Sequence, residues 1–78
     1  SLIMKIEILG SGRKKCKTLT ENTRTALTNL GLEAEIVKVT DYAEIAAHGV
    51  MSTPALAIDG TVVSAGKVLL SSEIEKLL

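Results

Sequence analysis

A single cysteine, Cys16, is the residue of this chain best suited to covalent chemistry. It follows a glycine-rich segment, residues 10–12, and three cations at positions 13–15, and Lys17 comes directly after it. The thiolate of cysteine is a nucleophile, and both positive charge and the N-terminal end of a helix favour that ionised form. The segment is therefore a candidate site for thiol chemistry.

The helical pattern that begins near Arg13 indicates which way Cys16 points. Cys16 lies on the apolar stripe of the predicted helix. The other members of that stripe are Leu19, Thr23, Ala26, Leu27 and Leu30. The thiol should therefore lean toward the sheet, where a free cysteine is commonly an inert packing residue. A reactive thiolate and a buried, inert thiol both stay open, because charge favours the thiolate and burial favours the neutral thiol.

Pro54 is the second notable residue, and Thr53 precedes it. Proline lacks a backbone N–H, so it tends to stand at the first residue of a strand or at the edge of a sheet. From these residues alone, the bond between Thr53 and Pro54 is interpreted as a trans bond that leads into a strand.

Hydrophobic periodicity divides the chain into short elements. We expect strands at residues 4–9, 33–39, 55–58 and 61–64, and helices at residues 13–30, 41–48 and from 71 through Leu77 and Leu78. Gly31 is a typical helix C-terminal cap, and Asp59-Gly60 favours a two-residue hairpin. Asp41 and Glu44 predict a capping box at the second helix, and His48 suits a capping role at its end.

The resulting order is β-α-β-α-β-β-α. The first three elements form a βαβ unit, whose two strands must be parallel, and the hairpin adds an antiparallel edge. We expect an α/β fold in which helices cover both faces of a four-stranded mixed sheet. The Cys16 loop follows the carboxyl end of the first strand, where open α/β sheets usually bind their ligands.

Composition argues against several classes of function. Nine basic and nine acidic residues give zero net charge, and Tyr42 is the one aromatic residue. We therefore expect no nucleic-acid binding, which needs a basic surface or stacking platforms. No apolar run is long enough to span a membrane, and no Cys/His cluster indicates a metal, so we expect neither membrane, metal nor cofactor. A free thiol suits a reducing compartment, and we expect a cytoplasmic monomer.

The length of 78 residues is that of one small domain. We expect residues 4–78 to form it around an aliphatic core. Residues 1–3, ahead of Met4, are interpreted as a remnant of an expression vector and are given no function.

The Cys16 loop and the Thr53-Pro54 segment together suggest a family. Residues 10–16, 49–56 and 59–60 carry this likeness, along with Leu19, Asn22, Ala26, Leu30, Gly31 and Gly66. On these residues the chain resembles the thioredoxin-like superfamily. More narrowly, it is similar to the small redox-active disulfide proteins of prokaryotes, which are minimal thioredoxin- or glutaredoxin-like proteins. Their first strand ends in Gly-x-Gly-Cys-x-x-Cys.

This resemblance implies a sheet order of 2-1-3-4. It also implies a cis Thr53–Pro54 bond that faces the Cys16 loop and exposes backbone groups for a bound peptide or glutathione. Arg13 would then stand where the family has its first, nucleophilic cysteine, through natural divergence or engineering. Cys16 would be the resolving cysteine, so a two-cysteine cycle is impossible within this chain.

The function implied by the resemblance is thiol–disulfide exchange limited to a monothiol route through Cys16. Glutathione, another low-molecular-weight thiol or a partner protein would complete the cycle. Whether such a degenerate site still makes the chain an enzyme stays open. The alternative is a non-catalytic binding module, in which Arg13, Thr53 and Pro54 hold a thiol, a peptide or an anionic ligand. In a third hypothesis Cys16 joins two chains.

Overall fold

The computed structural model describes residues 3–78, so Ser1 and Leu2, most of the segment interpreted as a remnant, lie outside the described residues. The described elements are β1 (Met4–Leu9), α1 (Lys14–Leu30), β2 (Ala34–Val39), α2 (Tyr42–Ala47), β3 (Ala55–Ile58), β4 (Thr61–Ala65) and α3 (Ser71–Glu75). The predicted order of elements is confirmed. Of the residues described, none belongs to a helix long and apolar enough to cross a membrane.

The four strands form one mixed sheet in the order β2-β1-β3-β4, as the resemblance implied. Strand β1 pairs in parallel with β2 and antiparallel with β3, which in turn pairs antiparallel with β4. The turn at Asp59 and Gly60 has positive φ at both residues, as a two-residue hairpin requires. Because β1 is central, the loop that follows it opens in the middle of one end of the sheet.

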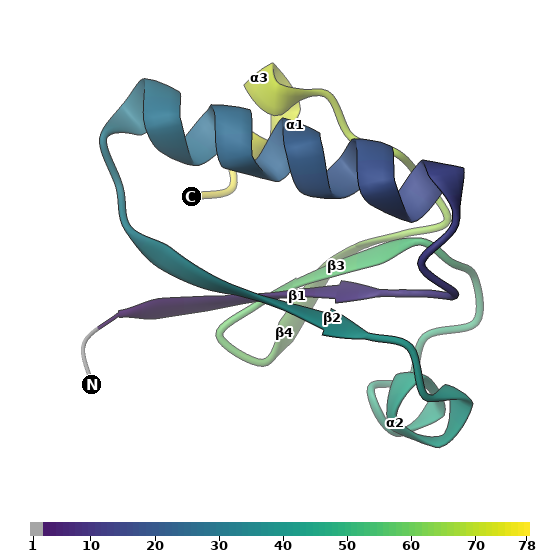
Figure 1. The fold of residues 1–78 in the computed structure, drawn as a ribbon. Helices are drawn as coiled ribbons and strands as arrows, with labels where there is room; N and C mark the ends of the chain where they lie inside the picture. The colour runs from purple at the N-terminus through teal and green to yellow at the C-terminus, as the bar shows by residue number, and fades with distance from the viewer. Residues whose placement is uncertain (1–2) are drawn as a thin grey trace.

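Helices cover both faces of this sheet, as expected (Figure 1). Helices α1 and α3 lie on one face, over a core that includes Ile6, Ile8, Leu19, Leu56 and Ile74. On the other face, Ile45 of α2 packs with Leu9, Val39, Ala55 and Ala57. The two loops that lead into α1 and β3 meet at one end of the molecule, which is therefore the place to look for a site.

Some predicted helix boundaries are wrong. Asp41 is the N-cap of α2, but its side chain makes no capping hydrogen bond, so the predicted capping box is absent. The first turn of α2 is exposed, and water can satisfy its N–H groups. Helix α3 ends at Glu75 and excludes Leu77 and Leu78. Leu30 is 43% exposed, because it lies in the last turn of α1, where the chain turns away.

Candidate active site

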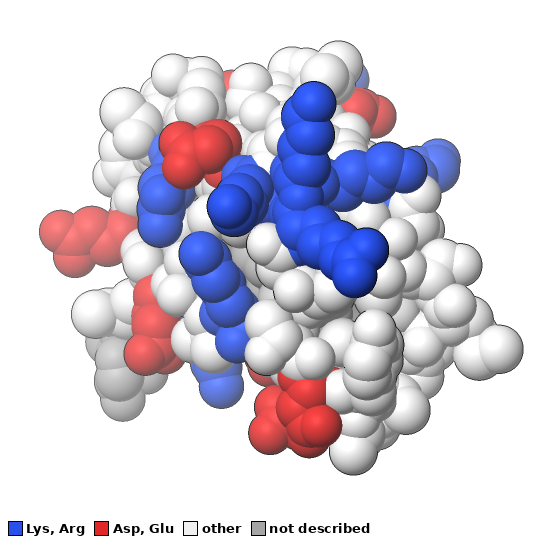
Figure 2. Space-filling model, turned by 45° about the vertical axis from the view of Figure 1, so that its right-hand side comes forward, with Lys and Arg blue, Asp and Glu red and all other residues white. Residues whose placement is uncertain are grey.

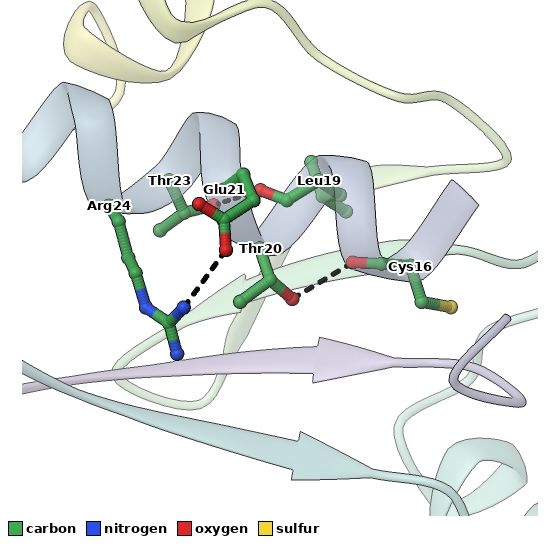
Figure 3. A network of polar contacts seen from close by, with 6 residues as sticks. All are labelled: Cys16, Leu19, Thr20, Glu21, Thr23 and Arg24. Carbon is green, nitrogen blue, oxygen red and sulfur yellow. Dashed lines mark hydrogen bonds and ion pairs between the residues drawn. The ribbon is translucent and has the colours of Figure 1, made fainter. Parts of the chain in front are cut away.

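Cys16 lies in the first turn of α1 and is buried against the sheet. Figure 3 shows its side chain leaving the helix on the side that faces the strands. The backbone carbonyl of Cys16 accepts a hydrogen bond of 2.8 Å from the hydroxyl of Thr20. Thr23 bonds to the carbonyl of Leu19 in the same way, so both buried hydroxyls are satisfied within the helix. These bonds allow threonines to occupy the apolar stripe beside Cys16.

Gly10, the first residue after β1, brings the backbone against the thiol. A Cβ at Gly10 would lie 2.5 Å from Sγ of Cys16, 3.5 Å from Cβ of Thr53 and 3.6 Å from Cα of Pro54. Its φ of +155° is also one that residues with a side chain rarely adopt. The missing side chain of Gly10 therefore leaves room for both the thiol and the Thr53–Pro54 segment beside the backbone that follows β1.

The peptide bond between Thr53 and Pro54 is cis. Pro54 is buried and its carbonyl accepts a hydrogen bond of 2.9 Å from the N–H of Gly66, which ties the segment to the end of β4. Thr53 is exposed, and its backbone N–H and C=O make no hydrogen bond within residues 3–78. These two groups are available to a ligand that lies along the segment.

Cys16 and this segment line one open groove of about 270 Å³, which we call the Cys16 groove. It is lined by Ser11, Arg13, Lys14, Lys15, Cys16, Thr53 and Pro54. A second, smaller space of about 10 Å³ also borders Cys16, roughly the room that one water molecule needs, and Thr20, Lys38 and Thr40 help to line it. The thiol thus borders both a small space and an open groove. The groove gives reagents an open approach to the thiol.

Positive charge surrounds this groove. Arg13, Lys14, Lys15 and Lys17 are all exposed, and the first turn of α1 has no acidic residue. None of these cations forms an ion pair with another residue in the part of the chain that the structure describes. Figure 2 shows Lys and Arg side chains gathered on this end of the molecule. The cations and the N-terminal end of α1 act in the same direction, and both attract anions.

The structure thus brings together the four residues that the sequence singled out, Cys16, Arg13, Thr53 and Pro54, around one groove. Sequence reasoning missed the role of Gly10, which it treated only as part of a glycine-rich segment. The one signal in the sequence was the place of Gly10 directly after the first predicted strand, at the start of the loop that leads to Cys16. Within residues 3–78 no group of three His, Cys, Asp or Glu side chains is placed to hold a metal ion.

A second contact that sequence reasoning missed lies on the α2 face of the sheet. Glu7, buried in β1, faces His48, the C-cap of α2, with 3.4 Å between Oε1 and Nε2. The pKa of His48 is raised, chiefly by its hydrogen bond to the backbone carbonyl of Glu44 and also by Glu7. The one available signal was an acidic residue within the apolar strand 4–9.

Comparison with known proteins places this chain in a family. The family model described as thioredoxin domain matches residues 4–78. A protein named thioredoxin from Methanothermobacter thermautotrophicus is 38% identical over 76 residues, which is 97% of this chain and 99% of that protein. A thioredoxin from Methanocaldococcus jannaschii is 45% identical over 73 residues, covering 94% of this chain and 84% of that protein. The chain therefore belongs to the thioredoxin domain family.

Proposed function

We propose that Cys16 carries out thiol–disulfide exchange by a monothiol route. The observation that carries this proposal is the position of its thiol at the base of an open groove, opposite Thr53 and Pro54. Exchange needs a thiolate and access together. The groove offers access, and the surrounding cations and helix end favour the thiolate.

The chemistry balances without a second cysteine. The Cys16 thiolate attacks the glutathione sulfur of a glutathionylated protein, so a new S–S bond forms as the old one breaks. The protein's sulfur leaves as a thiolate and takes up a proton. A second glutathione, as its thiolate, then attacks the glutathione sulfur bound to Cys16 and releases the Cys16 thiolate. In sum, the mixed disulfide of the protein and one reduced glutathione become the free protein thiol and glutathione disulfide.

Arg13, Thr53 and Pro54 would bind the substrate in this scheme. The free backbone groups of Thr53 can pair with the extended backbone of a peptide or of glutathione. Arg13 stands at the rim of the groove, where its guanidinium can pair with a carboxylate. By resemblance, Arg13 also occupies the position of the family's first cysteine. We further propose that the chain acts as a monomer on protein thiols or glutathione in the cytoplasm, as one domain over residues 4–78.

The test follows the sulfur of Cys16. After incubation with glutathione disulfide, mass spectrometry should find one glutathione bound to Cys16, and reduced glutathione should remove it. Cys16→Ser should form no adduct and is the matched control. Arg13→Cys should form an internal disulfide and reduce a protein disulfide faster than the unmodified chain.

Failure of the unmodified chain to form the adduct, under conditions in which it stays folded, would contradict the monothiol proposal. Binding of glutathione without any covalent adduct would instead support the non-catalytic binding module. If Arg13→Cys forms no internal disulfide, the assignment of Arg13 to the position of the first cysteine is wrong.

A further inference from the structure

Both ring nitrogens of His48 face hydrogen-bond acceptors. Nδ1 lies 2.9 Å from the backbone carbonyl oxygen of Glu44, one helical turn earlier. Nε2 lies 3.4 Å from Oε1 of Glu7. The side chains of His48 and Glu7 are 23% and 11% exposed. The contact therefore joins the end of α2, where His48 is partly exposed, to the buried Glu7 of the central strand.

This geometry favours a proton on each nitrogen. A carbonyl oxygen only accepts, so Nδ1 must donate to Glu44. In a neutral imidazole, Nε2 would then turn a lone pair toward the carboxylate of Glu7, whereas an imidazolium donates to both partners. The raised pKa of His48 agrees with this reading, since its hydrogen bond to the backbone of Glu44 and the charges of Glu7 and Glu44 outweigh partial desolvation. Glu7 on β1 and Glu44 on α2 are the charged groups that act on it.

The contact stands at the start of the segment that reaches the Cys16 groove. His48 is followed by Gly49, which has a φ of +76°, and the chain then runs through residues 50–52 to Thr53. Glu7 lies in β1, three residues before Gly10, and the thiol of Cys16 packs against Gly10. Ile45 is the one buried residue among those of α2, so apolar packing anchors this helix only weakly.

We propose that His48 is a positioning residue. Its imidazolium, which donates to Glu44 and to Glu7, fixes the segment 49–53 and with it the Thr53–Pro54 wall of the Cys16 groove. When His48 loses the proton on Nε2, which faces Glu7, the wall loosens and access to Cys16 changes. This inference rests on the proposed function in one respect: it takes the Cys16 groove as the site whose wall His48 holds in place. The contact and its titration do not require Cys16 to be catalytic.

The sign of the effect on stability follows from linkage. Because the folded-state pKa of His48 is raised, its contribution is fully present below the unfolded value of about 6.5. It is lost as the pH rises through the higher folded-state pKa. The free energy of unfolding should therefore fall across this window.

The experiment combines three measurements between about pH 5.5 and pH 8.5, a range that spans the titration of histidine. NMR follows the imidazole of His48, which is unambiguous because the sequence contains one histidine. Urea unfolding gives stability, and a neutral thiol reagent gives the labelling rate of Cys16. Each is recorded for the unmodified chain, His48→Gln, Glu7→Gln and, as a control for charge alone, Glu33→Gln, whose site is exposed.

We expect the His48 pKa to be raised in the unmodified chain and lower in Glu7→Gln. After division by the thiolate fraction, the labelling rate of the unmodified chain should change severalfold at the His48 pKa. His48→Gln should lack that step, and Glu33→Gln should keep it. An ordinary or lowered His48 pKa, or the same step in His48→Gln, overturns the proposal.

Two further outcomes keep the tests separate. If His48→Gln does not fold, the titration of the unmodified chain and its comparison with Glu7→Gln still decide the question. If Cys16 forms no glutathione adduct while the labelling step follows His48, the proposed function fails and the positioning role stands.

Discussion

At the scale of single residues, the candidate site depends on Gly10, which has no side chain. Gly10 lets the backbone after β1 lie against the thiol of Cys16 and beside Thr53. Any Cβ there must displace the sulfur or the segment that carries Pro54. Close packing leaves little room for such a shift, so Gly10 links the shape of the groove to the stability of the fold.

Gly10→Ala should therefore destabilise the chain by about 1–3 kcal/mol, the usual cost of overpacking. The cost should be smaller when Cys16→Ala has removed the sulfur that the new methyl group meets. A double-mutant cycle by urea unfolding measures this coupling.

Gly12→Ala is the matched control, because Gly12 also has a positive φ, yet its nearest neighbour to a new Cβ is Thr40 at 3.8 Å. Its cost should not depend on Cys16. Equal costs of Gly10→Ala in both backgrounds would show that the close approach to the thiol does not matter.

At the scale of elements, α1 is held over the sheet partly by a polar bond to the segment before α3. Nδ2 of Asn22 donates to the carbonyl of Leu69 at 2.8 Å, and the contact is partly buried. Asn29 makes a bond of 3.0 Å to Glu75 of α3, but in an exposed position. Because α1 also carries Cys16, its attachment at Asn22 helps to set the place of the thiol.

Asn22→Ala should cost about 1–2 kcal/mol of unfolding free energy, because it leaves a partly buried carbonyl without its donor. Asn29→Ala makes the same change at an exposed bond, where water replaces the amide, and should cost about 0.5 kcal/mol or less. Chemical denaturation of the two variants side by side checks the order. Equal costs would mean that the Asn22 bond carries no special weight in attaching α1.

At the scale of the whole molecule, the net charge is zero, but the charged side chains are unevenly distributed over the surface (Figure 2). Cations gather around the Cys16 groove without ion-pair partners among residues 3–78 (Figure 2). No Asp or Glu lines the groove, although Figure 2 shows acidic side chains elsewhere on the same face. The local field at the groove is therefore positive although the molecule is neutral, and it should attract anionic disulfides and thiols.

Labelling of Cys16 by a negatively charged disulfide reagent should accordingly slow severalfold between about 20 mM and about 500 mM salt, as screening shortens the reach of the charges. A neutral disulfide reagent of similar size serves as the control and should show little change. The ratio of the two second-order rate constants is the quantity to measure. A salt-independent ratio would show that the cations do not act on the approaching reagent.

How much could be predicted from the sequence differs between the fold and the site. The order of elements, the hairpin at Asp59-Gly60 and the burial of Cys16 follow from local periodicity, and these predictions are confirmed. The capping box at Asp41 is wrong, because an exposed helix start can use water instead. Leu30 was expected on the buried stripe but is exposed. Periodicity does not show where a helix extends beyond the elements that cover it.

By itself, then, the sequence determined the elements and the chemistry available, a single thiol among cations. Its resemblance also implied the sheet order and pointed to the Thr53–Pro54 segment. The tertiary structure alone decided that Gly10 gives the thiol its place, that the cations surround one groove, and that Glu7 meets His48. The reason is physical: the periodicity and turn residues that indicate elements are local patterns of the sequence, whereas the places of Gly10, the cations and Glu7 depend on tertiary contacts. The approach of Gly10, the groove and the Glu7–His48 contact join residues from separate elements, and these residues come close together only when the sheet has formed.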